Sequence, residues 1–209
     1  MGMIETWMGV LTKPKETFAN EKKNSSIMAG VKQYAIIFAI IGVLMGIAVF
    51  ILQNMGIVDF SGLPLGGIAA IIVVPILVIV GGIVLTYIGV GIQFIIAKLL
   101  GGNGTFEQQY YLISITAIPM LLLSIVVNVI AGILGIIPFL GAIIAFLAIL
   151  ATNLYALYLQ TMAIKEAHQF STLKAVATWF IPAIIYVLVV VAVVAALLVS
   201  IMGIRSMNS

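Results

Sequence analysis

Cysteine is absent from the 209-residue sequence, histidine occurs once, and charged residues are scarce. Without cysteine, the chain can form neither a disulfide nor a thiolate metal site. Charged residues make up 7% of the chain, whereas an ordinary soluble domain has about 25%. Nine basic and six acidic residues are too few to cover the surface of a soluble globule of this length. A soluble enzyme, a nucleic-acid-binding protein and a disordered protein are therefore excluded.

Apolar residues dominate instead, at 64% of the sequence. A helix needs about 20 mostly apolar residues to cross the hydrocarbon core of a bilayer. The uncharged runs are long enough for five such helices and lack the alternating pattern of barrel strands. We predict an all-α integral membrane protein, a bundle of five transmembrane helices over residues 31–205, preceded by a short cytoplasmic amphipathic leader over residues 1–30. The spans are expected at about 31–52, 66–99, 110–131, 138–164 and 178–202.

The second span is longer than a straight helix needs to cross the bilayer. Pro75 lies inside it, and a proline removes one backbone hydrogen bond and crowds the preceding turn. The sequence therefore predicts either a long, tilted helix with a kink near Pro75 or a broken helix that lines a cavity.

The distribution of Lys and Arg predicts the orientation of the spans, because both residues concentrate in cytoplasmic loops. With the N-terminus inside, only Arg205 lies outside, together with the C-terminus. The other basic residues then lie inside, in the leader and in two later loops: Lys13, Lys15, Lys22, Lys23, Lys32, Lys98, Lys165 and Lys174. We therefore expect a multi-pass protein of the cell membrane, in contact with the lipid bilayer, with its N-terminus inside and its C-terminus outside.

The leader carries signals for two short helices. Trp7, Met8 and Leu11 are spaced to form one apolar face of an interfacial helix. Pro14 suits the first turn of a second helix. The Asn-Ser-Ser run at residues 24–26 supplies good N-cap residues for the helix that becomes the first span.

The sequence offers little for catalysis or metal binding. Ionisable residues are absent from the apolar interiors of the predicted spans, which argues against a proton-coupled pump. The one histidine, His168, falls in the loop before the last span, where we expect a solvated side chain, and one histidine cannot form a His-rich metal site. Neither a G-x-S-x-G elbow nor an H-E-x-x-H motif occurs. We therefore predict no catalytic residue, no metal ligand and no cofactor, and we expect the chain not to be an enzyme.

Uncharged polar side chains gather toward the cytoplasmic side of the spans. Gln93, Asn153 and Gln160 are candidates for a polar groove that opens to the cytoplasm and takes a headgroup, a small solute or a peptide. The same residues also suit hydrogen bonds between neighbouring helices, which Gln and Asn commonly make in membranes. The sequence leaves both interpretations open.

Three pairs of small residues, four positions apart, predict close helix contacts. Such pairs let two helix backbones approach closely, either within one chain or between copies in a homo-oligomer. The pairs are Gly42 with Gly46, Gly141 with Ala145, and Ala192 with Ala196.

Three segments together resemble a known family. They are residues 7–18 (WMGVLTKPKETF), residues 100–108 (LGGNGTFEQ) with Pro119 after them, and residues 163–171 (AIKEAHQFS) followed by Lys174-Ala175. In this order, and with five spans, the chain resembles the Yip family of Ypt/Rab-interacting multi-span membrane proteins over nearly its whole length, in particular the short prokaryotic members. The resemblance implies five transmembrane helices and a cytoplasmic N-terminus. Its eukaryotic members bind Rab-type GTPases in vesicle traffic, but their Asp-Leu-Tyr-Gly-Pro-type segment has no match here. The Ile-, Val- and Gly-rich helices favour an archaeal or bacterial origin.

Two functions are compatible with these features. The first is a non-enzymatic membrane scaffold or trafficking-like adaptor that recruits a protein partner at the cytoplasmic face. The second is a permease or channel-like transporter of a small solute or lipid, with a path past Pro75 and the polar groove. For the scaffold, the candidate partner contacts lie in the leader and in two cytoplasmic loops: Trp7, Pro14, Phe18, Phe106 and Phe170.

Overall fold

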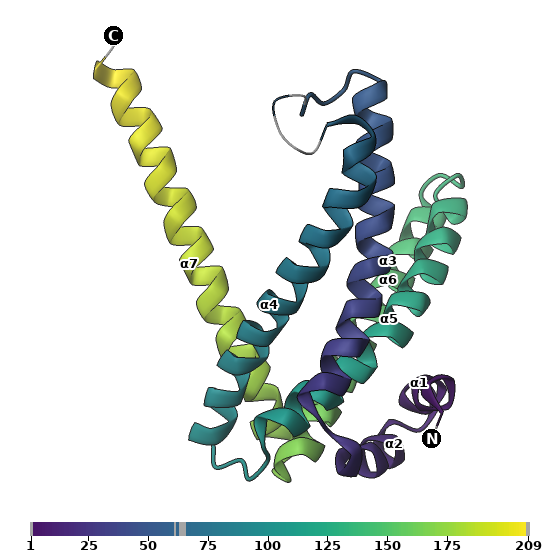
Figure 1. The fold of residues 1–209 in the computed structure, drawn as a ribbon. Helices are drawn as coiled ribbons and strands as arrows, with labels where there is room; N and C mark the ends of the chain where they lie inside the picture. The colour runs from purple at the N-terminus through teal and green to yellow at the C-terminus, as the bar shows by residue number, and fades with distance from the viewer. Residues whose placement is uncertain (1, 61, 63–65, 208–209) are drawn as a thin grey trace.

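Two short helices precede five long ones in the computed structural model (Figure 1). The structure describes residues 2–60, 62 and 66–207, and side chains as far as Ala196. The expected orientation of the spans places Arg205 outside, together with the C-terminus. The side chain of Arg205 lies beyond the part of the chain that the structure describes. The short helices of the leader are α1 (Met3–Thr12) and α2 (Pro14–Glu21), followed by one 3-10 turn, η1 (Lys22–Asn24).

The five long helices form the membrane domain. Each is long and apolar enough to cross a membrane, which confirms the predicted all-α fold with five spanning helices. Exposed apolar side chains cover much of their surface, as contact with the lipid bilayer requires. The helices are α3 (Ile27–Asn54), α4 (Ala70–Leu99), α5 (Phe106–Leu134), α6 (Leu140–His168) and α7 (Thr172–Met207), with a 3-10 turn, η2 (Gly67–Ala69), before α4.

Local sequence sets where several helices begin. Ser26 Oγ accepts a hydrogen bond from the Ala29 backbone N–H at 3.0 Å, so the predicted N-cap of α3 is confirmed. α2 begins at Pro14, as predicted. At the start of α5, Thr105 and Gln108 form a capping box in which each side chain accepts from the other's backbone N–H.

α3 and α4 approach closely along what we call the glycine seam, the contact of Gly42 and Gly46 with Ala70 and Pro75. A Cβ on Gly42 would lie 2.7 Å from Pro75 Cα, and one on Gly46 would lie 2.9 Å from the Ala70 carbonyl oxygen. Only glycine admits a backbone this close. α4 is continuous through Pro75, so the broken-helix alternative is wrong. Pro75 is the sixth residue of α4, so its missing N–H removes one backbone hydrogen bond, and the helix tolerates this loss without breaking.

α7 leans away from the other long helices above its first turns (Figure 1). Ala175 and Thr178 near its start are buried, whereas every described side chain from Ala183 to Ala196 is exposed. Its small pair, Ala192 and Ala196, therefore lies on an exposed surface. The main buried cluster lies instead where the leader meets α5 and α6, and it consists of Val10, Phe18, Tyr111, Leu112, Ile115, Leu159, Ala163 and Ala167.

Candidate functional site

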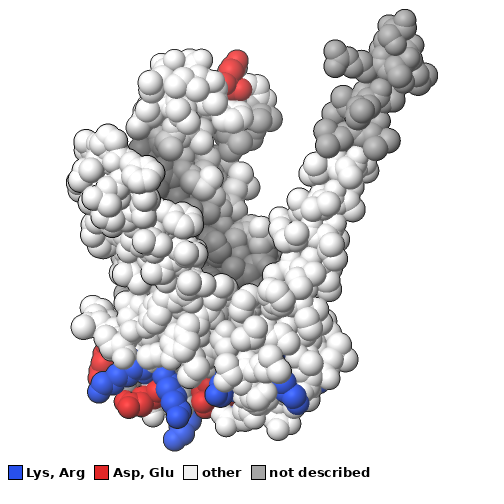
Figure 2. Space-filling model, turned by 180° about the vertical axis from the view of Figure 1, so that it is seen from behind, with Lys and Arg blue, Asp and Glu red and all other residues white. Residues whose placement is uncertain are grey.

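Charged side chains gather at one end of the molecule, which we call the charged base. It consists of the leader, the helix ends that carry Lys98, Lys165 and Lys174, and the two turns between these ends, at residues 100–105 and 169–171. Figure 2 shows basic (blue) and acidic (red) side chains together at this end, and red also at the opposite end. The buried core and the charges therefore occupy the same half of the bundle, and this half is the candidate functional site.

Apolar side chains dock the leader onto the bundle. Val10 of α1 and Phe18 of α2 are both 0% exposed, and they pack against Leu112, Ile115 and Leu159 of α5 and α6. Phe18 is one of the predicted partner contacts, and the structure places it inside the molecule. Burying two large apolar side chains stabilises the docked leader by about 1.5–3 kcal/mol for each.

A buried carboxylate forms the polar centre of this contact. Glu21, the last residue of α2, is 4% exposed. Its Oε2 accepts a hydrogen bond from the Tyr111 hydroxyl at 2.7 Å, and its Oε1 accepts one from the Thr6 hydroxyl at 3.2 Å. A buried carboxylate is costly unless donors satisfy it, so these two hydroxyls hold α1, α2 and α5 in one arrangement. No local pattern in the sequence marks Glu21, because it lies among lysines in a segment that looks solvated.

Three further hydrogen bonds tie the leader to α3 and α6. Trp7 Nε1 donates to Gln33 Oε1 at 3.1 Å. The Tyr155 hydroxyl donates to the Leu11 carbonyl oxygen at 2.6 Å. Lys22 Nζ donates to the carbonyl oxygen of Glu166 at 2.8 Å. The leader is therefore a fixed part of the charged base.

His168 is buried, and the prediction of a solvated loop histidine is wrong. The ring is 0% exposed, with Nε2 2.7 Å from Gln109 Oε1 and the Phe170 ring stacked at 5.4 Å between centroids. The reason is that α6 continues to His168 and the turn at residues 100–105 folds over it. A Cβ on Gly102 of that turn would lie 2.5 Å from His168 Nδ1, so the glycine admits the close contact.

Two lysines hold the turn at residues 100–105 in place. Lys98 Nζ donates to the carbonyl oxygens of Gly102 at 3.1 Å and Gly104 at 3.3 Å. Lys174 Nζ donates to the Leu100 carbonyl oxygen at 2.8 Å. Carbonyl groups at a helix C-terminus lack partners within the helix, so Lys174 satisfies the C-cap carbonyl of α4, and Lys98 satisfies two carbonyl groups of the turn that follows.

The structure brings two of the three polar groove candidates together. Gln160 Nε2 of α6 donates to Gln93 Oε1 of α4 at 3.2 Å. Asn153 lies apart from them, exposed, with its Nδ2 donating to the Ile149 carbonyl oxygen of its own helix at 2.8 Å. The glutamine pair thus forms a hydrogen bond between two helices.

The other predicted contact residues are half-buried around the charged base. Phe106 stacks on Tyr110 at 5.6 Å between centroids, Phe170 stacks on His168, and Trp7 and Pro14 belong to the leader. Of the remaining small residues, Gly141 packs against the Leu134 carbonyl oxygen, and its partner in the pair, Ala145, is half-buried.

Comparison with known proteins gives one match. The family model described as the Yip1 domain matches residues 8–203. The matched region begins within α1 and ends within α7, so it takes in the five long helices and most of the leader. Among curated proteins and solved structures, no match to the chain is found.

Proposed function

The chain belongs to the Yip1 domain family, as its sequence predicts, and on this premise we propose that it is a non-enzymatic scaffold of the cell membrane. It recruits a protein partner at the charged base. The observation that carries the proposal is the docked leader: Val10, Phe18 and Glu21 are buried against the bundle, so the outer face of α2 is a fixed surface. A fixed surface suits recruitment, because a partner need not order it on binding.

The charged base faces the cytoplasm in this proposal, which the excess of lysine at that end supports. Because the chain has no cysteine, its orientation can be tested with single cysteines. One replaces Lys15, on α2, and the other replaces Met55, at the far end of α3. Both side chains are exposed. We expect an impermeant maleimide to label Met55→Cys in intact cells and Lys15→Cys only after the membrane is opened. The reverse pattern would place the base outside.

The surface offered to the partner is the outer face of α2 and the residues beside it. Lys13, Lys15 and Lys23 are exposed there with one exposed acid, Glu16, so the face is basic and suits an acidic partner surface. Pro14 lies between Lys13 and Lys15. Of the five partner contacts predicted from the sequence, it is the one that we retain as a direct contact. The aromatic residues of the predicted contact set are buried or half-buried. In this proposal they hold the basic face of α2 in place and do not touch the partner.

The test is capture of the partner followed by a binding measurement. A photo-cross-linking amino acid at Asn20, exposed on α2, is expected to capture one protein in native membranes, and the same group at Met55 is the matched control. The captured protein is then purified, and its affinity is measured for the wild-type chain and for Lys13→Glu/Lys15→Glu. Reversal of both charges is expected to weaken binding about tenfold. Recovery of lipid and of the chain alone from Asn20 would refute recruitment, and bilayer flux that depends on Asn153 would favour the permease instead.

A further inference from the structure

α1 and α5 enclose a groove with walls made entirely of apolar side chains. Its volume is about 300 Å³. From α1 it is lined by Ile4, Trp7, Met8 and Leu11, and from α5 by residues that include Leu122 and Val126. Val10 and Phe18, the two buried apolar residues that dock the leader, are not among the residues that line this space.

On the α5 side, the groove is lined by the apolar part of the helix. α5 carries no charged residue after Glu107. Leu122 follows Glu107 by about four helical turns, which is roughly 22 Å along the axis. The α5 wall is 50% exposed at Leu122 and 54% exposed at Val126, so it continues the lipid-facing surface of a spanning helix.

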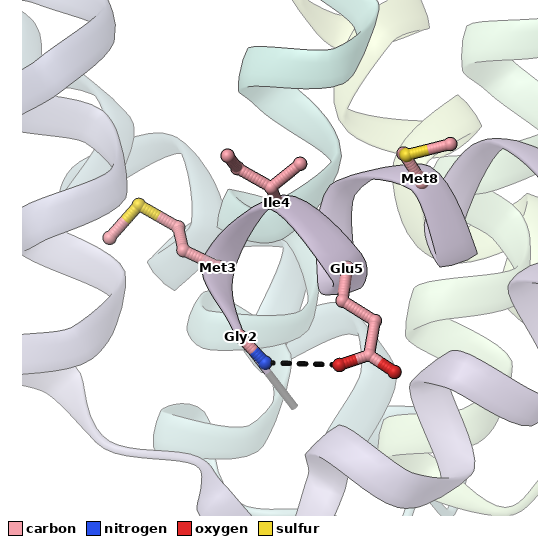
Figure 3. Close-up of a pocket in the computed structure, with 5 residues that line it drawn as sticks. All are labelled: Gly2, Met3, Ile4, Glu5 and Met8. Atoms are coloured by element: carbon pink, nitrogen blue, oxygen red, sulfur yellow. Dashed lines mark hydrogen bonds between the residues drawn. The ribbon is translucent and has the colours of Figure 1, made fainter.

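The outer face of α1 has the same apolar character. Ile4 is 69% exposed and Met8 is 63% exposed. Figure 3 shows both side chains on one side of α1, whereas the Glu5 carboxylate lies on the other side, where it accepts a hydrogen bond from the Gly2 backbone N–H at 3.2 Å. An apolar face of this kind is unstable in water and is typical of a helix that lies in the membrane interface.

We propose that the groove between α1 and α5 binds an acyl chain of a membrane phospholipid. The groove is continuous with the lipid-facing wall of α5, so the hydrocarbon of the same leaflet reaches it directly. Lys13 and Lys15 directly follow α1 and are exposed, so they supply positive charge for an anionic headgroup above the chain. The inference shares Lys13 and Lys15 with the proposed function, but the groove itself is lined by α1 and α5 and by no residue of α2, so its tests at Met8 and Trp7 do not depend on a protein partner.

The first test measures what covers α1 in a bilayer. Nitroxide labels are placed on Met8→Cys, at the groove, and on Lys15→Cys, on the charged face, in full-length protein in vesicles of phosphatidylcholine and phosphatidylglycerol. We expect the label at residue 8 to be accessible to oxygen and shielded from a water-soluble nickel complex, and the label at residue 15 to show the reverse. Shielding of residue 8 from both reagents would mean that protein covers the groove, and access to nickel would mean water. Either result would overturn the proposal.

The second test detects the acyl chain within the groove. Trp7 lines it, and the only other tryptophan is Trp179, so Trp179→Phe leaves Trp7 as the single reporter. In vesicles whose phospholipids carry bromine at mid-chain, we expect a loss of Trp7 emission relative to unbrominated vesicles. The control is Trp7→Phe, in which Trp179 reports from the start of α7. Unchanged Trp7 emission in brominated vesicles would exclude an acyl chain from the groove.

Discussion

Removal of one hydroxyl, in Tyr111→Phe, is expected to loosen the leader. The Tyr111 hydroxyl donates to Glu21 Oε2 at 2.7 Å, and Glu21 is 4% exposed. The variant leaves this buried carboxylate with the Thr6 hydroxyl, at 3.2 Å. A hydrogen bond to a charged group contributes about 1.5–3 kcal/mol, which corresponds to roughly a 10- to 150-fold larger population of undocked leader.

The population of undocked leader can be measured through Val10, which is 0% exposed. A cysteine at this position reacts with a maleimide only when the leader opens, so the labelling rate follows the open population. We expect Tyr111→Phe to raise that rate in vesicles roughly 10- to 150-fold.

Two matched tyrosines provide the controls. Tyr155→Phe removes a bond to the neutral Leu11 carbonyl oxygen, worth about 0.5–1.5 kcal/mol, so it should raise the rate roughly 2- to 10-fold. Tyr158 is 47% exposed, and Tyr158→Phe should leave the rate unchanged. A rate for Tyr111→Phe equal to that of Tyr158→Phe would refute the role assigned to Glu21.

Two further substitutions test the helix contacts. Gly42→Ala places a Cβ 2.7 Å from a backbone atom of α4. It should lower the free energy of unfolding, measured in detergent, by about 1–3 kcal/mol. Gly81→Ala, with nothing within 4 Å of its Cβ, should be neutral or stabilising by up to about 1 kcal/mol; equal effects would argue against the seam. His168→Leu leaves Gln109 without its 2.7 Å partner and should cost about 1–3 kcal/mol, and a double variant with Gln109→Leu should recover part of the loss. If the double variant is no more stable than His168→Leu, the hydrogen bond does not account for the loss.

The helices could be predicted from the sequence because the signals that define them are local. Long uncharged runs predict the five spans, and the start of α2 at Pro14 and the N-cap of α3 at Ser26 depend on residues within one turn of the helix start. The sequence leaves two alternatives open for α4 at Pro75, because tolerance of one missing backbone hydrogen bond depends on how the proline packs, here against the α3 backbone at Gly42.

The burial of polar residues in the charged base could not be predicted from the sequence in this way. Glu21 and His168 are fixed by partners far along the chain, at Tyr111 and Gln109. A glutamate among lysines and a histidine near a loop have the composition of a solvated surface, so nothing local distinguishes them from exposed residues. Tertiary contacts make them part of the interior: those with α5 for both residues, the Thr6 hydroxyl of α1 for Glu21, and the turn at residues 100–105 for His168.

The glycine seam has a consequence for the order in which the molecule loosens. Contact between helix backbones at Gly42 and Gly46 depends on dispersion, for which water does not compete. The docked leader depends in part on hydrogen bonds, for which water does compete. Urea added from the aqueous phase should therefore detach the leader while α3 and α4 stay paired, so that this helix pair outlasts the docked leader.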